Sequence, residues 1–315
     1  MRPLSVLVYE HLSAGAEGDQ AELLSVGRDM RTAMVSSLAA LPGVTVSHVA
    51  APWEDGGVRA RPGESAPALL SRLAVGHDLI WAVAPEAEGL LAACCASVPA
   101  ARWMGCDPDA IRVATSKSLT LAALEAVGVL TPLDPAVRQA ARAWVVKPDD
   151  GAGALATQRF QREEEARMAW ADRDARGLTS TLEPWVDGLP MSLSLVVGAS
   201  GTTLVSVNQL HMHVAPDGHV SMAGLTRNVI GEGDPARARL ARLARQVVAA
   251  IPGLKGFVGI DYVDHPVFGP VVIEVNPRVT WAFAGLSEAT GLSLGAMLLD
   301  VFAPEGRPVP EKAHA

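Results

Sequence analysis

Apolar runs and helical patterns alternate along the first hundred residues of the chain. The strand and helix patterns follow one another at residues 4–9, 20–41, 44–49, 66–75, 78–84 and 87–97. The first strand is almost continuously apolar, whereas the helices repeat their apolar positions about every 3.6 residues. Strands that alternate with helices predict a parallel β-sheet covered on both faces.

Two carboxylates follow strands of this predicted sheet, at the edge where α/β sheets bind ligands. Glu10 comes directly after the first strand, and Glu86 comes two residues after the third. Glu10 is a candidate substrate ligand, with a carboxylate of the turn as the alternative. For Glu86 we expect a negative charge at the start of the following helix.

The remainder of the chain is richer in strands. Helices are predicted at 119–126, 162–176, 235–251 and 286–301, and strands at 143–148, 178–186, 191–197, 202–210, 256–263 and 271–276. We further predict a loop at 52–63, a linker at 103–108, an unpaired basic turn at 222–228 and a frayed tail from 304. The chain is thus predicted to be an α/β protein of three parts, residues 1–108, 109–186 and 187–315.

Oxygen donors recur on two neighbouring strands near the end of the chain. Strand alternation puts Glu274 and Asn276 on the same face. The turn at 264–269 predicts a hairpin, which brings Asp261 of the preceding strand beside them. Two carboxylates and an amide suit a hard cation such as Mg²⁺, with coordination positions left for phosphates and water. The alternative is a set of solvated polar residues at strand ends.

Lys147 stands at the exit of an apolar strand, directly before a loop of small residues. Such a lysine is unusual unless its ammonium group has an anionic partner. The loop at 149–154 contains Gly151 and Gly153, and glycines let backbone N–H groups approach phosphates closely. The loop is not a P-loop, because no Gly-Lys-Ser/Thr follows. A hairpin turn with a surface lysine is the alternative.

Three further side chains are candidates for contacts with a substrate. Arg227 lies in the predicted basic turn and is able to grip a carboxylate with two hydrogen bonds, with a plain surface arginine as the alternative. His211 and His213 share one strand face. Because a metal site on these histidines lacks an evident third ligand, substrate contact and ordinary strand polarity are the stronger interpretations.

Charge and composition narrow the class of partner. The formal net charge is −8 and the pI is near 5.5, so we expect no nucleic-acid partner, because little on the chain neutralises phosphates. Three cysteines without metal-like spacing fit a reducing cytosol. No apolar run reaches membrane-spanning length and the N-terminus lacks a signal-peptide pattern, so we expect a cytoplasmic protein without a membrane partner.

The segments "GIDYV" (259–263) and "IEVNPR" (273–278) resemble the metal-binding hairpin of the ATP-grasp superfamily. The resemblance implies an ATP-grasp fold with an N-terminal parallel α/β (pre-ATP-grasp) domain. It also implies that Asp261, Glu274 and Asn276 hold magnesium ions against ATP, and that Arg278 contacts phosphate or an acyl-phosphate intermediate. The separation of 13 residues between the two carboxylates agrees with the family.

Other segments resemble the ATP-binding parts of the same superfamily. "SKSLTLAALEAVGVLTP" resembles the pattern in which a lysine starts a helix, although Ser116 stands where the family often has Asp. The strand before Lys147 and the loop after it resemble the lid over the phosphates, and the strand 178–186 resembles the segment that binds adenine. The implied ATP-binding residues are Lys117, Lys147, Asp149, Gly151, Gly153, Glu183, Trp185, Val186 and Asp187, the last in place of the usual ribose-binding acid.

A narrower resemblance covers most of the chain. "VYEHLSAGA", "APE" (84–86), "EPWVDGLPMSLSL", "TRN" (226–228) and "IEVNPR" are similar to the ligases of methanofuran biosynthesis, the tyramine–glutamate ligase family. This resemblance implies ATP-dependent activation of a carboxylate, which is otherwise a poor acyl donor, and joining of L-glutamate to tyramine or tyrosine. The implied cofactors are ATP and Mg²⁺ or Mn²⁺, and the implied partners are a small carboxylate and an amine.

Other functions stay open on the sequence alone. A ligase of tetrahydromethanopterin biosynthesis and a phosphotransferase that makes a phosphate ester are the nearest alternatives. A regulatory nucleotide-binding protein without turnover is less favoured, because the metal-binding trio is intact. The oligomeric state is open, a homodimer included.

Overall fold

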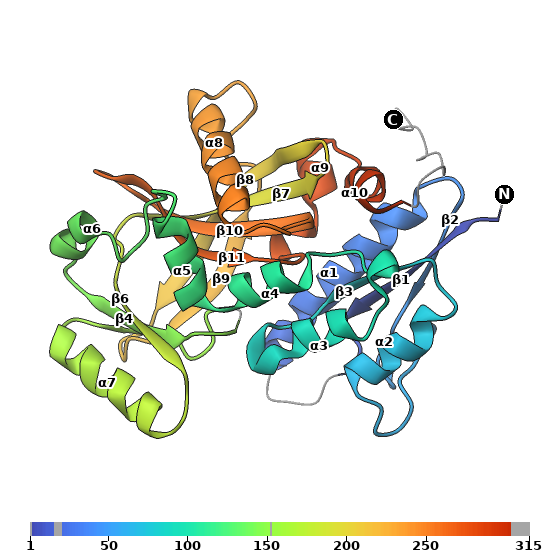
Figure 1. Ribbon diagram of the computed structural model, residues 1–315, viewed down its shortest axis with the longest axis horizontal. Helices are drawn as coiled ribbons and strands as arrows, with labels where there is room; N and C mark the ends of the chain where they lie inside the picture. Colours follow the sequence, from blue (N-terminus) through green and yellow to red (C-terminus); the bar gives the residue numbers. More distant parts are fainter. Residues whose placement is uncertain (1, 16–20, 152, 304–315) are drawn as a thin grey trace.

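A computed structural model describes residues 2–15, 21–151 and 153–303. Three β-sheets lie along the long axis of the molecule, the lid sheet at the left of Figure 1, the largest sheet in the middle and the N-terminal sheet at the right. The three sheets fall one each within residues 1–108, 109–186 and 187–315. The boundaries themselves stay a prediction.

The N-terminal sheet has the predicted parallel arrangement. Its order is β2 (Val44–His48), β1 (Leu4–Glu10) and β3 (Leu79–Val83). Its helices are α1 (Ala21–Ala39), α2 (Ala66–Ala74) and α3 (Leu90–Ala96). The predicted helix at 87–97 is wrong in its first turn, because Glu88 and Gly89 take left-handed conformations that separate a short 3₁₀ turn (η1, Ala87–Gly89) from α3.

The lid is a small antiparallel sheet with one helix packed on it. Its order is β5 (Gln158–Phe160), β4 (Trp144–Pro148) and β6 (Ser180–Pro184), with α7 (Glu163–Ala175) against β4 and β6. A short helix not predicted from the sequence, α6 (Pro135–Ala140), precedes β4.

The largest sheet is antiparallel throughout. Its order is β11 (Gly269–Asn276), β10 (Gly256–His265), β7 (Leu189–Gly198), β8 (Gly201–Val214) and β9 (Val220–Thr226). Both predicted hairpins, β7–β8 and β10–β11, are confirmed. The unpaired turn predicted at 222–228 is wrong, because a tight turn around Gly218 returns the chain and pairs β9 with β8 as far as Thr226.

Residues 103–108 are packed rather than an open linker. Trp103, Met104 and Cys106 are buried, and the Met104 N–H donates to the carbonyl of Ile80 in β3. The 3₁₀ turn η2 (Ala100–Arg102) comes before them. Helix α4 (Pro108–Thr115), which we did not predict, and α5 (Lys117–Glu125) follow. One hydrophobic cluster therefore runs from the N-terminal sheet into the largest sheet.

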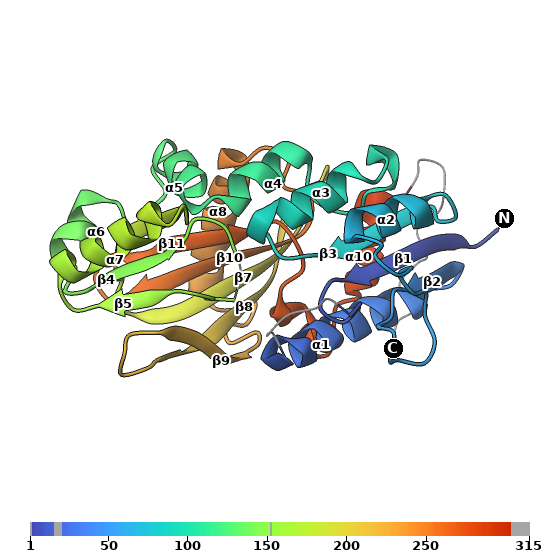
Figure 2. The ribbon, with the colours of Figure 1, turned by 90° about the horizontal axis from the view of Figure 1, so that it is seen from below.

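The predicted closing helix is two helices. Gly291 takes a left-handed conformation that ends α9 (Leu286–Thr290), and α10 (Leu294–Phe302) begins after it. Helix α10 packs on α1 and on β7 and β10, whereas α8 (Pro235–Ala250) packs on β7 and β8. In Figure 2, α1 lies on one face of the N-terminal sheet, and α2 and α3 lie on the other. The predicted frayed tail lies outside the described residues.

Candidate functional site

A row of polar side chains crosses one face of the largest sheet. Residues directly opposite each other on antiparallel strands project to the same face. The register pairs Glu274 of β11 with Asp261 of β10, Asp261 with Ser192 of β7, and Ser192 with Asn208 of β8. Neighbours in sequence project to the other face and belong to the core, among them Leu193, Val207, Ile260 and Val275. The sequence alternation thus places the polar row opposite the packed face.

The three predicted metal ligands meet at the β11 end of this row. The Asn276 Nδ2 donates to Asp261 Oδ2 at 3.2 Å, and Asp261 lies directly beside Glu274. Burial, the negative charge of Glu274 and a hydrogen bond shared with it hold the pKa of Asp261 well above its ordinary value. Because a divalent cation between the two carboxylates removes this cost, the donor set fits Mg²⁺.

Two lysines act on the same carboxylate. The Lys117 Nζ lies 3.7 Å from Glu274 Oε2 at the start of α5. Burial pushes the pKa of Glu274 up, but the positive charges of Lys117 and Lys147 outweigh it, and this pKa ends below its ordinary value. The Lys147 Nζ also pairs with Glu183 Oε2 at 2.9 Å, and both side chains are buried. The anionic partner expected for Lys147 is therefore Glu183.

The loop after Lys147 begins with a carboxylate that caps α5. Asp149 accepts from Ser116 Oγ at 2.7 Å and from the Ser118 N–H at 2.8 Å. Burial opposes the shift, yet these hydrogen bonds lower the pKa of Asp149. Gly151 and Gly153 follow with φ of 116° and 68°, conformations that favour glycine. Asp149 thus ties the lid to the helix that carries Lys117.

Arg278 forms a buried ion pair with the N-terminal domain. Its Nη2 lies 2.8 Å from Glu86 Oε2, and the two side chains are 10% and 4% exposed. Negative charges outweigh burial and raise the Arg278 pKa, with Glu86 the largest of them and Glu274 and Asp261 after it. Within the described chain, Glu86 Oε1 and Arg278 Nε are buried without a hydrogen-bond partner. The expected charge at a helix start is in fact half of an interdomain pair.

The segment expected at adenine joins the lid to the largest sheet. Glu183 and Val186 are buried, Trp185 is half-buried and Asp187 is exposed. The Arg159 guanidinium of β5 stacks on the Trp185 ring at 5.3 Å. The structure therefore gives three of these four residues an enclosed position, and their contact with adenine stays a prediction.

The candidate substrate residues of β8 and β9 have partners of their own. Arg227 donates through Nε and Nη2 to the carbonyls of Ala282 and Trp281, in the 3₁₀ turn η3 (Trp281–Phe283). These two bonds occupy one edge of the guanidinium, so a two-bond grip on a carboxylate would have to use its remaining N–H groups and stays a prediction. Burial lowers the pKa of Arg227.

The two histidines are exposed on β8. The ring Nε2 of His211 lies 2.8 Å from Thr226 Oγ1. Within the described residues, no group of three or more His, Cys, Asp or Glu side chains is placed to hold a metal ion. The structure thus adds no third ligand of these types beside the two histidines within the described residues, and the interpretation of His211 and His213 as substrate contacts stays a prediction.

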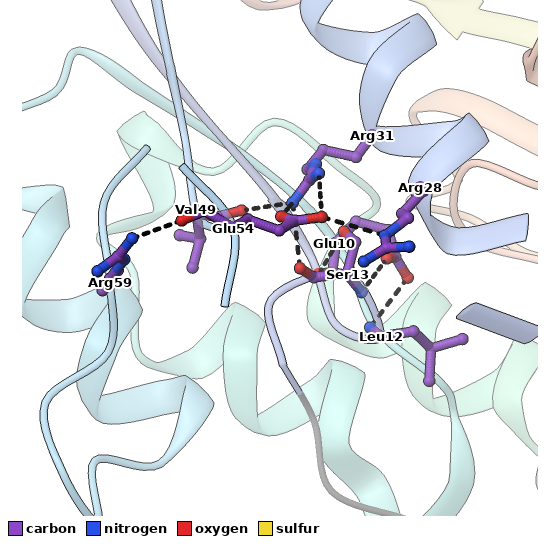
Figure 3. A network of polar contacts seen from close by, with 8 residues as sticks. All are labelled: Glu10, Leu12, Ser13, Arg28, Arg31, Val49, Glu54 and Arg59. Carbon is purple, nitrogen blue, oxygen red and sulfur yellow. Dashed lines mark hydrogen bonds and ion pairs between the residues drawn. The ribbon is translucent and has the colours of Figure 1, made fainter. Parts of the chain in front are cut away.

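Glu10 faces its own turn. Its carboxylate accepts from the N–H groups of Leu12 and Ser13, at 3.2 and 2.7 Å, and the side chain is buried. Next to it, Arg28 and Arg31 of α1 hold Glu54 of the loop after β2 (Figure 3). Glu10 is therefore a carboxylate of its own turn, which was the alternative interpretation. A contact of Glu10 with substrate stays a prediction.

The polar network around Asn208 was not predicted from the sequence. Asn208 is fully buried and bonds to Ser192, Ser194 and Ser206. A possible signal was present, because an asparagine inside an apolar strand run requires buried partners. Ser192 and Ser194 alternate with apolar residues in β7, so the sequence pattern predicts that they share a face. It does not predict that Asn208 of β8 is their partner.

Comparison with known proteins gives the family. The ATP-grasp domain family matches residues 114–281, and the pre-ATP-grasp domain family matches residues 45–111. A search of curated protein sequences finds no match. No helix among the described residues is long and apolar enough to cross a membrane.

Solved structures share the fold at low sequence identity. An ATP-grasp superfamily protein of Archaeoglobus fulgidus superimposes with a TM-score of 0.71 at 18% identity, over 94% of this chain and 88% of that one. The D-alanine–D-alanine ligase of Bacillus anthracis, complexed with ATP, has a TM-score of 0.65 at 14% identity, over 95% and 96%. A D-cycloserine synthetase has a TM-score of 0.64 at 22% identity, over 94% and 99%. With its two domain matches and the carboxylate hairpin in place, the chain belongs to the ATP-grasp family.

Proposed function

We propose that this protein is an ATP-dependent ligase that joins a carboxylate to an amine through an acyl phosphate. The observation that carries the proposal is the convergence of charges at Glu274. Asp261 lies beside it, Lys117 lies 3.7 Å away, and Lys147 lowers its pKa. Phosphoryl transfer needs charge neutralisation and alignment more than a protein nucleophile, and this site is built for both.

Each charged group has a part in this proposal. Asp261, Glu274 and Asn276 would hold Mg²⁺ or Mn²⁺, which when bound neutralises and aligns the phosphates of ATP. Lys117 and Lys147 would balance the negative charge that remains on ATP, and Arg278 would contact the transferred phosphoryl group. Residues 149–154, with Gly151 and Gly153, would fold over the phosphates and exclude water, because an acyl phosphate hydrolyses readily.

The lid and the segment that follows it would hold the nucleotide base. We propose that Glu183, Trp185 and Val186 bind adenine and that Asp187 binds the ribose. The enclosed position of the first three supports this assignment. Asp149 would act indirectly, because its carboxylate is used at the start of α5.

For the substrates, we propose L-glutamate and an aromatic amine such as tyramine or tyrosine, as the resemblance to methanofuran ligases suggests. Glu10, His211, His213 and the unused edge of Arg227 are the candidate contacts. Arg227 is half-buried beside η3, and its remaining N–H groups support a role near the substrate.

The test is ADP release by the purified protein across pairs of acids and amines, with mass spectrometry of the products. We expect slow release with glutamate alone, faster release with the correct amine, and one amide per ADP. ADP with a phosphate ester and no amide would favour a phosphotransferase. If only a pterin substrate supports amide formation, the glutamate assignment is wrong and the ligase assignment stands.

A further inference from the structure

Asn208 is the centre of a buried hydrogen-bond network in the polar row. Its Nδ2 donates to Ser192 Oγ at 3.2 Å and to Ser194 Oγ at 3.1 Å. Its Oδ1 accepts from Ser206 Oγ at 2.9 Å and from the Asn228 N–H at 3.2 Å. All four hydrogen-bonding positions of the amide are thus filled.

The backbone partner fixes which way the amide points. The N–H of Asn228 is able only to donate, so the atom that faces it is the amide oxygen. The amide nitrogen therefore faces Ser192 and Ser194 and is able only to donate to them. Both serine oxygens accept from Asn208, and each hydroxyl proton is left to point elsewhere.

The two serines differ in what lies next to them. Ser192 is directly opposite Asp261, whereas Ser194 is opposite Gly259. A Cβ at Gly259 would meet the Thr280 side chain, so this part of the row is covered. Ser194 is 1% exposed and Ser192 is 6% exposed. Ser192 is therefore the less enclosed of the two serines, and it is the one directly opposite a carboxylate of the site.

We propose that the Ser192 hydroxyl donates a hydrogen bond to the carboxylate of the acid substrate, and that Asn208 orients it for this purpose. This inference rests on the proposed ligase function. One carboxylate oxygen attacks the γ-phosphorus of ATP, a new O–P bond forms, and ADP leaves with the electrons of the broken bond. The other oxygen becomes the carbonyl oxygen and keeps the hydrogen bond from Ser192.

The second half of the reaction uses the same contact. When the amine attacks the carbonyl carbon, negative charge develops on the carbonyl oxygen, and a donor placed beside it stabilises that charge. As the amide forms, the C–O bond to the phosphate breaks, and the leaving inorganic phosphate takes the proton that the amine nitrogen loses. Ser192 is thus a substrate-binding residue, and Asn208 is a positioning residue.

The first test is Ser192→Ala, with Ser194→Ala as the matched control. A hydrogen bond to a charged group contributes about 1.5–3 kcal/mol, so we expect kcat/KM for the acid to fall about tenfold to a hundredfold. The KM for ATP should stay within about twofold of the wild-type value. Ser194→Ala removes the same hydroxyl from the same asparagine at the covered position, and its kcat/KM for the acid should change by less than about threefold.

The second test is Asn208→Asp, which keeps the shape but offers only acceptors. Ser192 is then free to donate to the new carboxylate, so its proton turns away from the substrate. We expect the loss in kcat/KM to match that of Ser192→Ala, and the double variant to lose little more than either single one. If Asn208→Asp does not fold, the two serine variants decide the question.

The outcomes separate this inference from the proposed function. The assay uses the full chain with the acid that supports ADP release, L-glutamate first. A Ser192→Ala enzyme equal to wild type overturns the subsite and leaves the ligase function standing. Equal losses in Ser192→Ala and Ser194→Ala also overturn it, because the effect is then packing. If no acid and amine pair gives an amide with the wild-type protein, the proposed function is wrong and the subsite is wrong with it.

Discussion

Two neighbouring carboxylates in the site have opposite titration behaviour because their neighbours differ. Asp261 is buried against Glu274, so its pKa is raised, whereas Glu274 faces Lys117 and Lys147, so its pKa is lowered. The two lysines thus favour the charged form of Glu274, whereas burial beside Glu274 opposes the charged form of Asp261.

The first prediction concerns Glu274. Glu274→Gln keeps the shape of the side chain and removes one charge that would face the cation. We expect a folded protein whose turnover falls about 100-fold or more, the scale of losing one electrostatic contributor to a transition state. ADP release at saturating ATP, measured over a range of Mg²⁺ concentrations, checks it.

Asp264→Asn is the matched control for Glu274→Gln, since it makes the same change of charge at an exposed position three residues along β10 from Asp261. Its turnover should be close to wild type. Near-normal turnover in Glu274→Gln, with intact folding, would remove the basis of the metal assignment.

At the scale of elements, the lid is joined to the β8–β9 hairpin as well as to its own linking strand. The Arg159 N–H of β5 donates to the Gly218 carbonyl at 2.8 Å, and the Val220 N–H donates to the Thr157 carbonyl at 3.0 Å. The Gln158 side chain adds a bond to the Asp217 carbonyl at 2.9 Å. The lid and the hairpin that carries His211 and His213 are therefore expected to move together.

The second prediction uses Gly218→Ala to test the hydrogen bonds between the lid strand and the β8–β9 hairpin. Gly218 has φ of 87°, and a Cβ there would clash with the Arg159 carbonyl oxygen, so the lid strand must separate from the hairpin. We expect faster hydrogen exchange at residues 157–160 and 218–220 and a KM for ATP raised several-fold. Gly201→Ala is the control, because Gly201 also has positive φ, 122°, but no atom lies near its added Cβ. Equal effects of the two changes would mean that backbone strain alone is responsible.

The loop after β2 is held by a carboxylate at partly buried arginines. Glu54 accepts from Arg31 at 2.6 Å and from Arg28 at 3.1 Å. The hydrogen bond from Arg31 is the main reason that the pKa of Glu54 lies below its ordinary value of 4.5. Because the folded-state pKa is the lower one, the stabilisation is present above pH 4.5 and is lost as the pH falls through the folded-state value.

The third prediction follows from the lowered folded-state pKa of Glu54. Glu54→Gln should lower the melting temperature near pH 7, and the gap to wild type should shrink as the pH falls below about 4.5. Thermal unfolding from pH 7 to pH 3 measures it. Asp55→Asn makes the same charge change at the exposed neighbour. Its melting temperature should differ little from that of the wild type at every pH. If the difference in melting temperature between Glu54→Gln and wild type does not change with pH, the ionised Glu54 carboxylate does not stabilise the fold in this way.

Features that depend on neighbouring residues were predictable from the sequence, whereas features that depend on contacts between distant residues were not. The β10–β11 hairpin was predictable, and with it the neighbouring positions of Asp261, Glu274 and Asn276, because a two-residue alternation and a turn signal lie close together in the sequence. Helix α4 was not predictable, because the Asp107-Pro108 pair that starts it is equally typical of a linker between domains. The direction of Arg227 was unpredictable, because its partners are carbonyls more than fifty residues away.

At the scale of the whole molecule, the N-terminal domain and the largest sheet behave as one packed unit. One hydrophobic cluster contains residues of both, and a second contains α1, β1 and α10. The ion pair of Glu86 with Arg278 joins the same two parts across 192 residues of sequence. Arg278 is therefore positioned by a domain that carries none of the proposed ATP-binding residues.

The last prediction concerns this interdomain pair. Removing one partner of a buried ion pair leaves an uncompensated charge, which typically costs about 3–5 kcal/mol. Glu86→Gln keeps one oxygen acceptor, so we expect the lower end of that range, measured by urea unfolding. Glu88→Gln is the matched control, because it makes the same change at an exposed residue of the same turn. We also expect Glu86→Gln to reduce turnover more than it raises the KM for ATP, since Arg278 would lose its anchor. If Glu86→Gln and Glu88→Gln are equally stable and equally active, the pair neither joins the domains nor positions Arg278.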